Sequence, residues 1–402
     1  METNILTTAL TNETSPELLR NEIDSRIVKI RPSSTPLDQI SRLGSARRAG
    51  SMRVEYYSVD TKEGSAALDE TVRSLSLEPG KPFTLKVNNG AIFSETETVL
   101  IPDITVNAGN YNGQALVCYV TAVSSDSITL IPVNIAGTTA PIEAGELKMG
   151  ARIVRMGRAA RELDVQTSQF IVLPRKDYNY CQIFKSQVEE SLYQRLADKE
   201  VGWQFTDQEE VAIMDMRLGM EKSFLFGARS RIELAGTGDE VFLTGGIWNQ
   251  TDNDYPYELG ALTEGDLVSL ARQAFTGHSG ASRKVLLAGS GLIEALNRMD
   301  TVRVVSAEDK KTVWGIDFHL IVTKFGTLYV HLSEVFDLCG MPDCGMVIDP
   351  ELLTKYSHVP FSAERISFRK QGLRNTEGVV LTEASCLVLR QPKAHMRIMP
   401  RH

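Results

Sequence analysis

Cysteine is scarce in this chain of 402 residues, and the cysteines present argue against a disulfide framework. Their number is odd, and three lie inside apolar runs: the five are Cys118, Cys181, Cys339, Cys344 and Cys386. Sparse, buried thiols are typical of a protein made in a reducing compartment. The pair in "CGMPDC" (Cys339 and Cys344) has no second ligand pair nearby, and a structural zinc site needs four ligands. We therefore expect no metal there.

Long apolar runs and targeting signals are also missing. No window approaches the ~18 consecutive apolar residues of a membrane-spanning helix. The first 30 residues lack the basic region and apolar block that define a signal peptide. We expect a soluble protein that is made in the cytoplasm.

Excess positive charge is missing as well, since the formal net charge is -8. This balance argues against nucleic-acid binding as the main role. Basic residues do gather in "SRLGSARRAGSMR", at Arg42, Arg47, Arg48 and Arg53. Such a run is usually a solvated loop, and contact with a polyanion is the alternative. The hydrophobic content of 42% is enough for a substantial core and for two or three domains.

Motifs for catalysis and cofactor binding are absent too. Gly289 and Gly291 flank Ser290 between a predicted strand and helix, where a phosphate-binding turn would lie, but the GxGxxG and P-loop patterns do not fit. His319 and His331 lie on opposite arms of a predicted hairpin, and no third ligand accompanies them. Carboxylate pairs framed as in glycosidases are not found. We expect no catalytic residue, no cofactor-binding residue, no metal ligand and no cofactor.

What is present begins with a polar N-terminal segment. Residues 1–50 carry Pro16, Pro32 and Pro36, and Ser15 is a candidate cap for a short helix with Pro16 at its first position. The segment is an arm, whose apolar residues need another surface, often a neighbouring subunit, to cover them.

From Met52 to about Ile171 the composition turns to valine, isoleucine, threonine and tyrosine in short runs. The "SSDS" between "VTAV" and "ITLIPV" predicts a hairpin turn. Four or more short strands indicate a compact β module, barrel-like or sandwich-like. It could bind sugar or a partner protein, and a decorated loop that folds on itself is the interpretation we favour.

Two helices are predicted next. Gln182–Leu196 has apolar residues every four positions, and Thr206–Ile232 follows with a capping box between Thr206 and Glu209. The second helix would be about 40 Å long. Arg217 and Glu221 are four apart and should pair on its solvent side. Two apolar stripes predict a broad buried face: Val211, Met214, Leu218 and Leu225, and beside them Ile213, Met216, Met220 and Phe224.

The remaining chain alternates between helix and strand patterns. Leu262–Phe275 is an amphipathic helix with Thr263 as its candidate cap, "RKVLLAG" is a buried strand, and "SGLIEALNRM" is a helix. Val313–Phe336 alternates about a turn, as an antiparallel hairpin does, and further strands follow towards the C-terminus.

This order of elements resembles the major capsid proteins of tailed bacteriophages with the Hong Kong 97-type fold. The stretches that carry the resemblance are "STPLDQISRLG", "RVEYYSVD", "YNYCQIFKSQVEES", "EEVAIMDMRLGMEKSFLFGAR" and "VFLTGGIWN". The resemblance implies an α+β fold with a long spine helix, an axial α/β lobe, an N-terminal arm and an extended β-rich loop carrying an inserted small β module. It also implies these regions: an N-terminal arm over 1–50, the extended loop over 51–178 with the module at about 80–150, a peripheral domain over 179–253 with the spine helix at 206–232, an axial domain over 254–355, and C-terminal strands over 356–402.

The function implied by the resemblance is self-assembly, without enzymatic turnover. Such a protein forms hexamers and pentamers of an icosahedral shell enclosing double-stranded DNA, which it meets non-specifically, for instance at Arg47 and Arg48. It would be made in the host cytoplasm and reside in the virion. Its candidate partners are its own copies and portal, scaffold and decoration proteins, and no membrane is expected. Two alternatives stay open: a phage tail or baseplate protein with a glycan-binding β module, and a cytosolic α/β enzyme with a site near Ser290.

Overall fold

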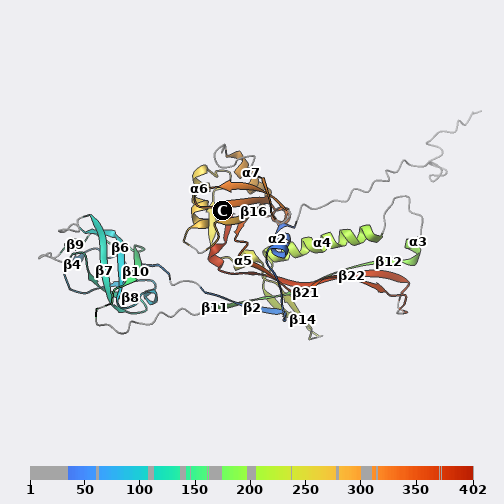
Figure 1. Cartoon of the computed structure of the whole chain (residues 1–402), viewed down its shortest axis with the longest axis horizontal. Coiled ribbons are helices and arrows are strands. Elements are labelled where there is room, and N and C mark those ends of the chain that lie inside the picture. Colours follow the sequence, from blue (N-terminus) through green and yellow to red (C-terminus); the bar gives the residue numbers. More distant parts are fainter. Residues whose placement is uncertain are drawn as a thin grey trace, which may run out of the picture. The chain divides into compact units, whose positions relative to one another are not determined.

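The computed structural model divides the chain into two compact units (Figure 1). Unit 1 comprises Met1–Ser58 and Lys176–His402, and unit 2, Val59–Arg175, is inserted within it. The described residues are 35–59, 63–106, 113–135, 142–144, 146–160, 162, 174–196, 205–236, 238–277, 280–299, 310–313, 316–370, 372 and 374–401. The predicted short helix capped by Ser15 lies outside them.

Unit 2 is an all-β module with a core of its own. An antiparallel sheet has the order β3-β10-β6-β7-β8-β5, and β4 pairs with β9. Its core includes Ile101, Leu116 and Leu130, all fully buried. The predicted β module and its hairpin turn between β7 and β8 are confirmed. The elements are β3 (Ser65–Ala67), β4 (Leu75–Leu77), β5 (Phe83–Lys86), η1 (Gly90–Ile92), β6 (Glu97–Val106), β7 (Gln114–Val123), β8 (Ser127–Pro132), β9 (Ile142–Ala144) and β10 (Arg152–Arg158).

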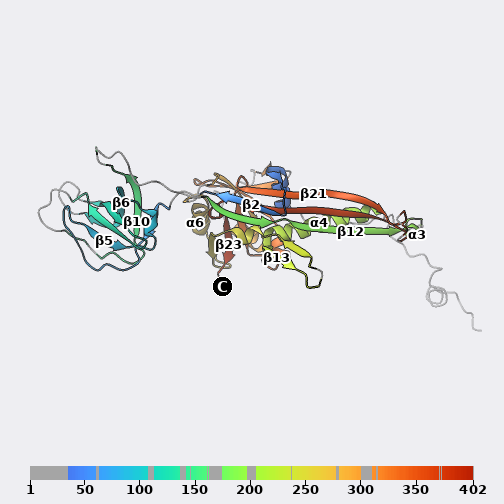
Figure 2. The same cartoon turned by 90° about the horizontal axis from the view of Figure 1, so that it is seen from below.

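Unit 1 contains a long four-stranded sheet of order β1-β21-β22-β12, with a long helix, α4, packed along it (Figure 2). Three of these strands, β21, β22 and β12, are antiparallel, and β1 joins β21 in parallel. Beside this sheet, β2 and β11 form a two-stranded ribbon. The bounds are α2 (Pro36–Gly44), β1 (Ala46–Arg48), β2 (Arg53–Ser58), β11 (Arg175–Tyr180), β12 (Gln182–Ser191), α3 (Leu192–Leu196), α4 (Phe205–Phe226), β21 (Leu353–Ser367) and β22 (Thr376–Leu389).

The prediction of a helix over Gln182–Leu196 is wrong for most of its length. Residues 182–191 form β12, which pairs with β22 over ten positions, and helix α3 occupies only the last five residues. The apolar residues of this stretch recur every four positions. That interval is close to one helical turn and is also two repeats of a strand, so the pattern fits both. Phe184 and Val188 are buried on the same face of the strand.

The long helix is confirmed, but it is shorter than predicted at its C-terminal end. It ends at Phe226, and Ser230–Glu233 forms β13. Gly227 packs so tightly that a Cβ there would lie 2.4 Å from the Ser223 carbonyl oxygen and 2.5 Å from that of Thr244. The helix begins at Phe205, which places Thr206 in the first turn instead of at the cap. Its buried apolar residues lie in its C-terminal half: Met216, Met220, Phe224 and Leu225.

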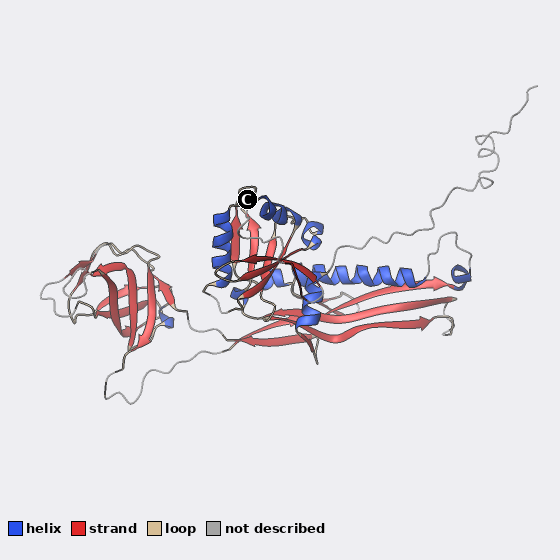
Figure 3. Ribbon diagram, turned by 45° about the horizontal axis from the view of Figure 1, so that its top comes forward, coloured by secondary structure: helices blue, strands red, loops and turns tan. Residues whose placement is uncertain are grey.

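The α/β lobe of unit 1 is built on a seven-stranded sheet of order β15-β23-β20-β16-β19-β18-β17 (Figure 3). Strand β16 is buried on both faces, because Leu286 packs with α6 and α7 while Leu287 joins the core beneath α4. The Thr263 cap is confirmed, with a capping box to Asp266, and so is the antiparallel hairpin β18–β19. The elements are β15 (Asp254–Tyr257), α6 (Glu264–Phe275), β16 (Arg283–Ala288), α7 (Ser290–Arg298), β17 (Lys310–Val313), β18 (Ile316–Val322), β19 (Thr327–Leu332), α8 (Glu334–Leu338), β20 (Gly345–Ile348), η3 (Pro392–Ala394) and β23 (Met396–Pro400).

Two short elements complete unit 1: the hairpin β13–β14, in which β14 is Glu240–Leu243, and helix α5 (Ile247–Gln250). The fold class predicted from the sequence, α+β with a long helix, an α/β lobe and a β module, is confirmed.

Candidate assembly surfaces

Helix α2 ties the N-terminal segment to the long helix through a buried carboxylate. The amides of Leu37 and Asp38 donate to the two carboxylate oxygens of Glu221, each at 2.7 Å. The first amides of a helix have no partner within the helix, and the positive end of its dipole favours an acidic group. Glu221 of α4 therefore caps a helix that lies more than 180 residues away in sequence. Burial raises the pKa of Glu221 to about 8, and the two amides oppose that rise.

Asp38 connects the same helix to the sheet through buried ion pairs. Its carboxylate lies 2.9 Å from Nη1 of Arg217 and 2.6 Å from Nζ of Lys355 on β21. Lys355 also pairs with Glu383 of β22 at 2.8 Å. The side chains of Asp38, Lys355 and Glu383 are almost completely buried, so the loss of any one charge would leave another unpaired. We call these residues, with Arg217 and Glu221, the α2 anchor.

The predicted pair of Arg217 and Glu221 on the solvent side of the helix is wrong. Both residues do lie on one face of α4, as a spacing of four requires. That face is covered by α2, which takes Glu221 as its cap and offers Asp38 to Arg217. Sequence spacing could not reveal this arrangement, because the covering helix comes from a distant part of the chain.

The hairpin β13–β14 presents an apolar face to solvent. Ile232 lies directly opposite Val241, and Leu234 follows on the same face by strand alternation. These side chains are 45%, 38% and 48% exposed, respectively. The hairpin is held at its base by the ring of Phe242, 5.3 Å from that of Tyr180. A two-stranded hairpin is marginally stable alone, and exposed apolar patches mark interaction sites.

Strand β21 has an open edge. Strand β1 pairs with it only at Lys355–Ser357, and within the described residues no strand pairs on that side of Val359–Ser367. The opposite edge pairs with β22 along most of its length, with irregularities between Ser357 and Ser362. Unpaired backbone amides and carbonyls at an edge can accept a strand from another chain.

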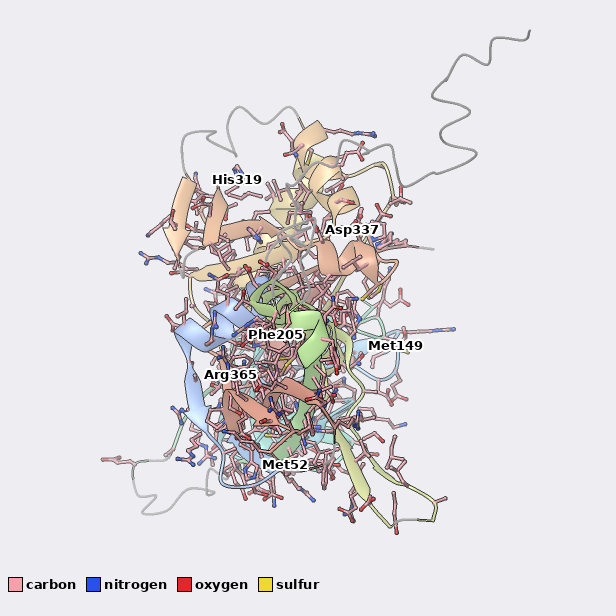
Figure 4. The ribbon with its side chains drawn as sticks, turned by 90° about the vertical axis from the view of Figure 1, so that its right-hand side faces the viewer. Met52, Met149, Phe205, His319, Asp337 and Arg365 are labelled. Atoms are coloured by element: carbon pink, nitrogen blue, oxygen red, sulfur yellow. The ribbon has the colours of Figure 1, made fainter. Side chains whose placement is uncertain are left out.

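A cavity of about 390 Å³ lies where the β21–β22 turn meets the start of α4. Phe205 and Arg365, both labelled in Figure 4, line it. Arg369 and Lys370 from the turn and Glu190 from β12 line it as well. Arg365 is exposed and reaches Glu209 only at 4.0 Å. The lining of the cavity therefore combines three basic side chains with two acidic ones, Glu190 and Glu377.

The positions singled out for chemistry have structural partners. Gly289 does join β16 to α7, and a Cβ there would lie 2.4 Å from the Pro342 carbonyl oxygen, so close packing accounts for the glycine. The Ser290 hydroxyl donates to Asp337. The Nδ1 of His331 donates to the Asp317 carbonyl oxygen at 3.1 Å, and burial lowers the pKa of His331. His319 lies opposite Val330.

Among the described residues, no three or more histidine, cysteine or acidic side chains are placed to hold a metal ion. All five cysteines are free thiols, and Cys339 is exposed whereas Cys344 is buried. No described helix combines the length and the apolar character needed to cross a membrane.

The basic run near the start of unit 1 divides into two parts. Arg47 and Arg48 are exposed on β1. Arg53, by contrast, lies 4.2 Å over the ring of Tyr178 and pairs with Glu55 at 3.1 Å. Arg47 and Arg48 are therefore placed to meet a polyanion, and so is Arg42, which is exposed near the end of α2.

The structure thus has an apolar hairpin face and an open strand edge, and both features favour association with other chains. The chain belongs to the SU10 major capsid protein family, whose model matches residues 3–400. It is a phage head shell protein located in the virion, and the prediction of a major capsid protein is confirmed.

Three solved structures are similar to this chain. One from Gordonia phage Cozz has 9% identity and a TM-score of 0.46, covering 96% of this chain and 92% of the other. The capsid of an empty GTA particle has 10% identity and a TM-score of 0.46, covering 99% and 100%. The capsid of cyanophage P-SCSP1u has 8% identity and a TM-score of 0.45, covering 99% of both chains. No curated protein matches the sequence.

Proposed function

We propose that this chain assembles into hexamers and pentamers of an icosahedral shell that encloses double-stranded DNA. The observation that carries the proposal is the exposed apolar face of Ile232, Leu234 and Val241 on a hairpin whose Phe242 packs against Tyr180 near its base. Contact with a second copy would remove this face from water and stabilise the hairpin. Obligate assemblies usually bury 2,000 Å² or more per interface, roughly, so further contacts are needed.

The open edge of β21 and the basic cavity beside it supply such further contacts. The edge offers backbone groups over Val359–Ser367, and the cavity offers Arg365, Arg369 and Lys370 to an acidic segment of a neighbouring copy. In the proposed shell, residues 254–355 form the axial domain that meets its copies around the capsomer axes, and 179–253 belong to the peripheral domain.

Contact with packaged DNA is weak and non-specific in this proposal. Arg47 and Arg48 are exposed, and the chain as a whole carries a net charge of -8. Because few basic groups contact phosphates and the net negative charge repels DNA, the shell can lie near DNA without binding it tightly. Portal, scaffold and decoration proteins are the other partners proposed, synthesis takes place in the host cytoplasm, and the chain performs no catalytic turnover.

The experiment that tests the proposal places a charge on the apolar hairpin face. Purified wild-type chain is compared with Val241→Asp by sedimentation velocity and negative-stain microscopy. We expect rings or shells from the wild type and mainly single chains from the variant. Glu233→Gln, on the opposite face of the same hairpin, is the matched control and should assemble normally. Shells of normal yield from Val241→Asp would show that this face is not an assembly contact.

A further inference from the structure

Two buried thiols meet where the chain returns from unit 2 into the long sheet. The Sγ atoms of Cys181 and Cys386 lie 3.6 Å apart, and both side chains are fully buried. Around them pack Ala49, Val54 and Val388. Neither thiol takes part in the assembly surfaces described above, and the two residues are separated by 205 positions in sequence.

The strand register places the two cysteines directly opposite each other. The ladder between β12 and β22 pairs Gln182 with Ser385, so one further step pairs Cys181 with Cys386. The amide of Cys181 donates to Met52 at 2.7 Å and therefore points away from β22. In an antiparallel ladder this is the non-hydrogen-bonded type of pair, with Cα atoms about 4.5 Å apart, within the range that a disulfide bridges.

We propose that Cys181 and Cys386 form a disulfide on exposure to peroxide, and that this bond fastens β12 to β22 in the released particle. The sulfurs must approach by about 1.6 Å, the difference between 3.6 Å and the bond length of about 2.0 Å, which side-chain rotation can supply. The bond would close a covalent loop around most of unit 1 and hold the entry of β12 in place.

The reaction balances with hydrogen peroxide as the oxidant. Cys181 loses its proton, its sulfur attacks one peroxide oxygen, and the O–O bond breaks to give a sulfenic acid and hydroxide, which takes up the proton as water. Cys386 then loses its proton, and its sulfur displaces hydroxide from the sulfenic sulfur, giving the disulfide and a second water. The hydrogen bond between the thiols lowers the pKa of Cys181 and raises that of Cys386, which favours Cys181 as the attacking sulfur.

The setting of this reaction rests on the proposed function, since a particle leaves a reducing cell for an oxidising environment. Thiols that stay reduced in a cytosol can be oxidised on a virion. The bond itself does not depend on assembly, because both cysteines belong to one chain. Tests on unassembled chain and on particles therefore separate the two proposals.

The test is peroxide treatment of the full-length chain, purified under reductant and then freed of it. Free thiols are counted after denaturation, and tryptic peptides are mapped by mass spectrometry without reduction. We expect loss of two of the five thiols, a linked peptide pair containing Cys181 and Cys386, and an apparent melting temperature higher by roughly 5–10 °C. Particles treated in the same way should give the same linked pair.

The matched control is Cys386→Ser, which removes the resolving thiol and leaves Cys181 in place. Peroxide should convert its Cys181 to a sulfenic acid that dimedone traps when it is present during denaturation, with no linked peptide and no rise in melting temperature. Cys181→Ser provides the reciprocal variant if the first folds poorly. Recovery of Cys181 and Cys386 as unlinked residues from peroxide-treated wild-type chain, either as free thiols or oxidised singly, would overturn the inference.

Discussion

Replacing Glu221 with alanine is the sharpest test of the α2 anchor. The variant removes both acceptors of the Leu37 and Asp38 amides, which donate at 2.7 Å in a fully buried site. Each unsatisfied buried donor costs about 1–3 kcal/mol, and the variant leaves two amides of the same helix turn without an acceptor. We therefore expect a loss of about 3–4 kcal/mol in the free energy of unfolding of unit 1, measured by urea denaturation.

The same variant should release α2 before the rest of unit 1 unfolds. Limited proteolysis should cut within residues 35–45 faster than in the wild type, while cleavage of unit 2 is unchanged. Glu209→Ala is the matched control on the same helix, because Glu209 reaches only the exposed Arg365, at 4.0 Å, and should change stability by less than about 0.5 kcal/mol. A cost below about 1 kcal/mol for Glu221→Ala, with unchanged proteolysis, would refute the anchor.

Three further predictions concern unit 1. Because burial raises the pKa of Glu221 from 4.5 to about 8, the folded state holds a proton that the unfolded state releases, so stability should fall as pH rises from about 5 to 8. Glu221→Gln should flatten this fall in urea titrations run across that range, and an equal slope in both proteins would contradict the assignment. Gly227→Ala should cost about 2 kcal/mol or more, measured by thermal unfolding, since a Cβ there meets two backbone carbonyl oxygens within 2.5 Å; an unchanged melting temperature would mean that the turn adjusts freely. Met216→Asp should abolish soluble assembly, because it buries an unpaired charge beneath α4, and normal particles seen by negative stain would show that this face is not buried.

The sequence predicted best what depends on local pattern. The capping box at Thr263, the hairpin β18–β19 and the strands of unit 2 all follow from residues near one another in the chain. The helix prediction for residues 182–191 was wrong because an apolar spacing of four residues fits a strand as well as a helix. The end of α4 was missed because no proline marks it: the helix ends at Phe226, just before the tightly packed Gly227.

The assembly surfaces and the α2 anchor could not be predicted from the sequence pattern, for a different reason. Asp38 and Glu221 meet across more than 180 residues, and so do Cys181 and Cys386. Pairings of this kind depend on how the sheet and the helix pack together. The spacing of apolar residues along the sequence does not predict which distant residues will meet. The apolar face of the hairpin could have been found in the alternation of "SRIEL" and "EVFL". The predicted helix was too long and took in the first three residues of "SRIEL", which hid the first strand.

The most direct measurement of the central claim is the size distribution of the purified full-length chain across concentration, by sedimentation velocity, followed by electron microscopy of the heaviest fraction. Association through the hairpin face and the open edge of β21 predicts rings of five or six copies and closed shells that grow with concentration. A single species of one chain at every concentration, also with a scaffold partner present, would contradict it.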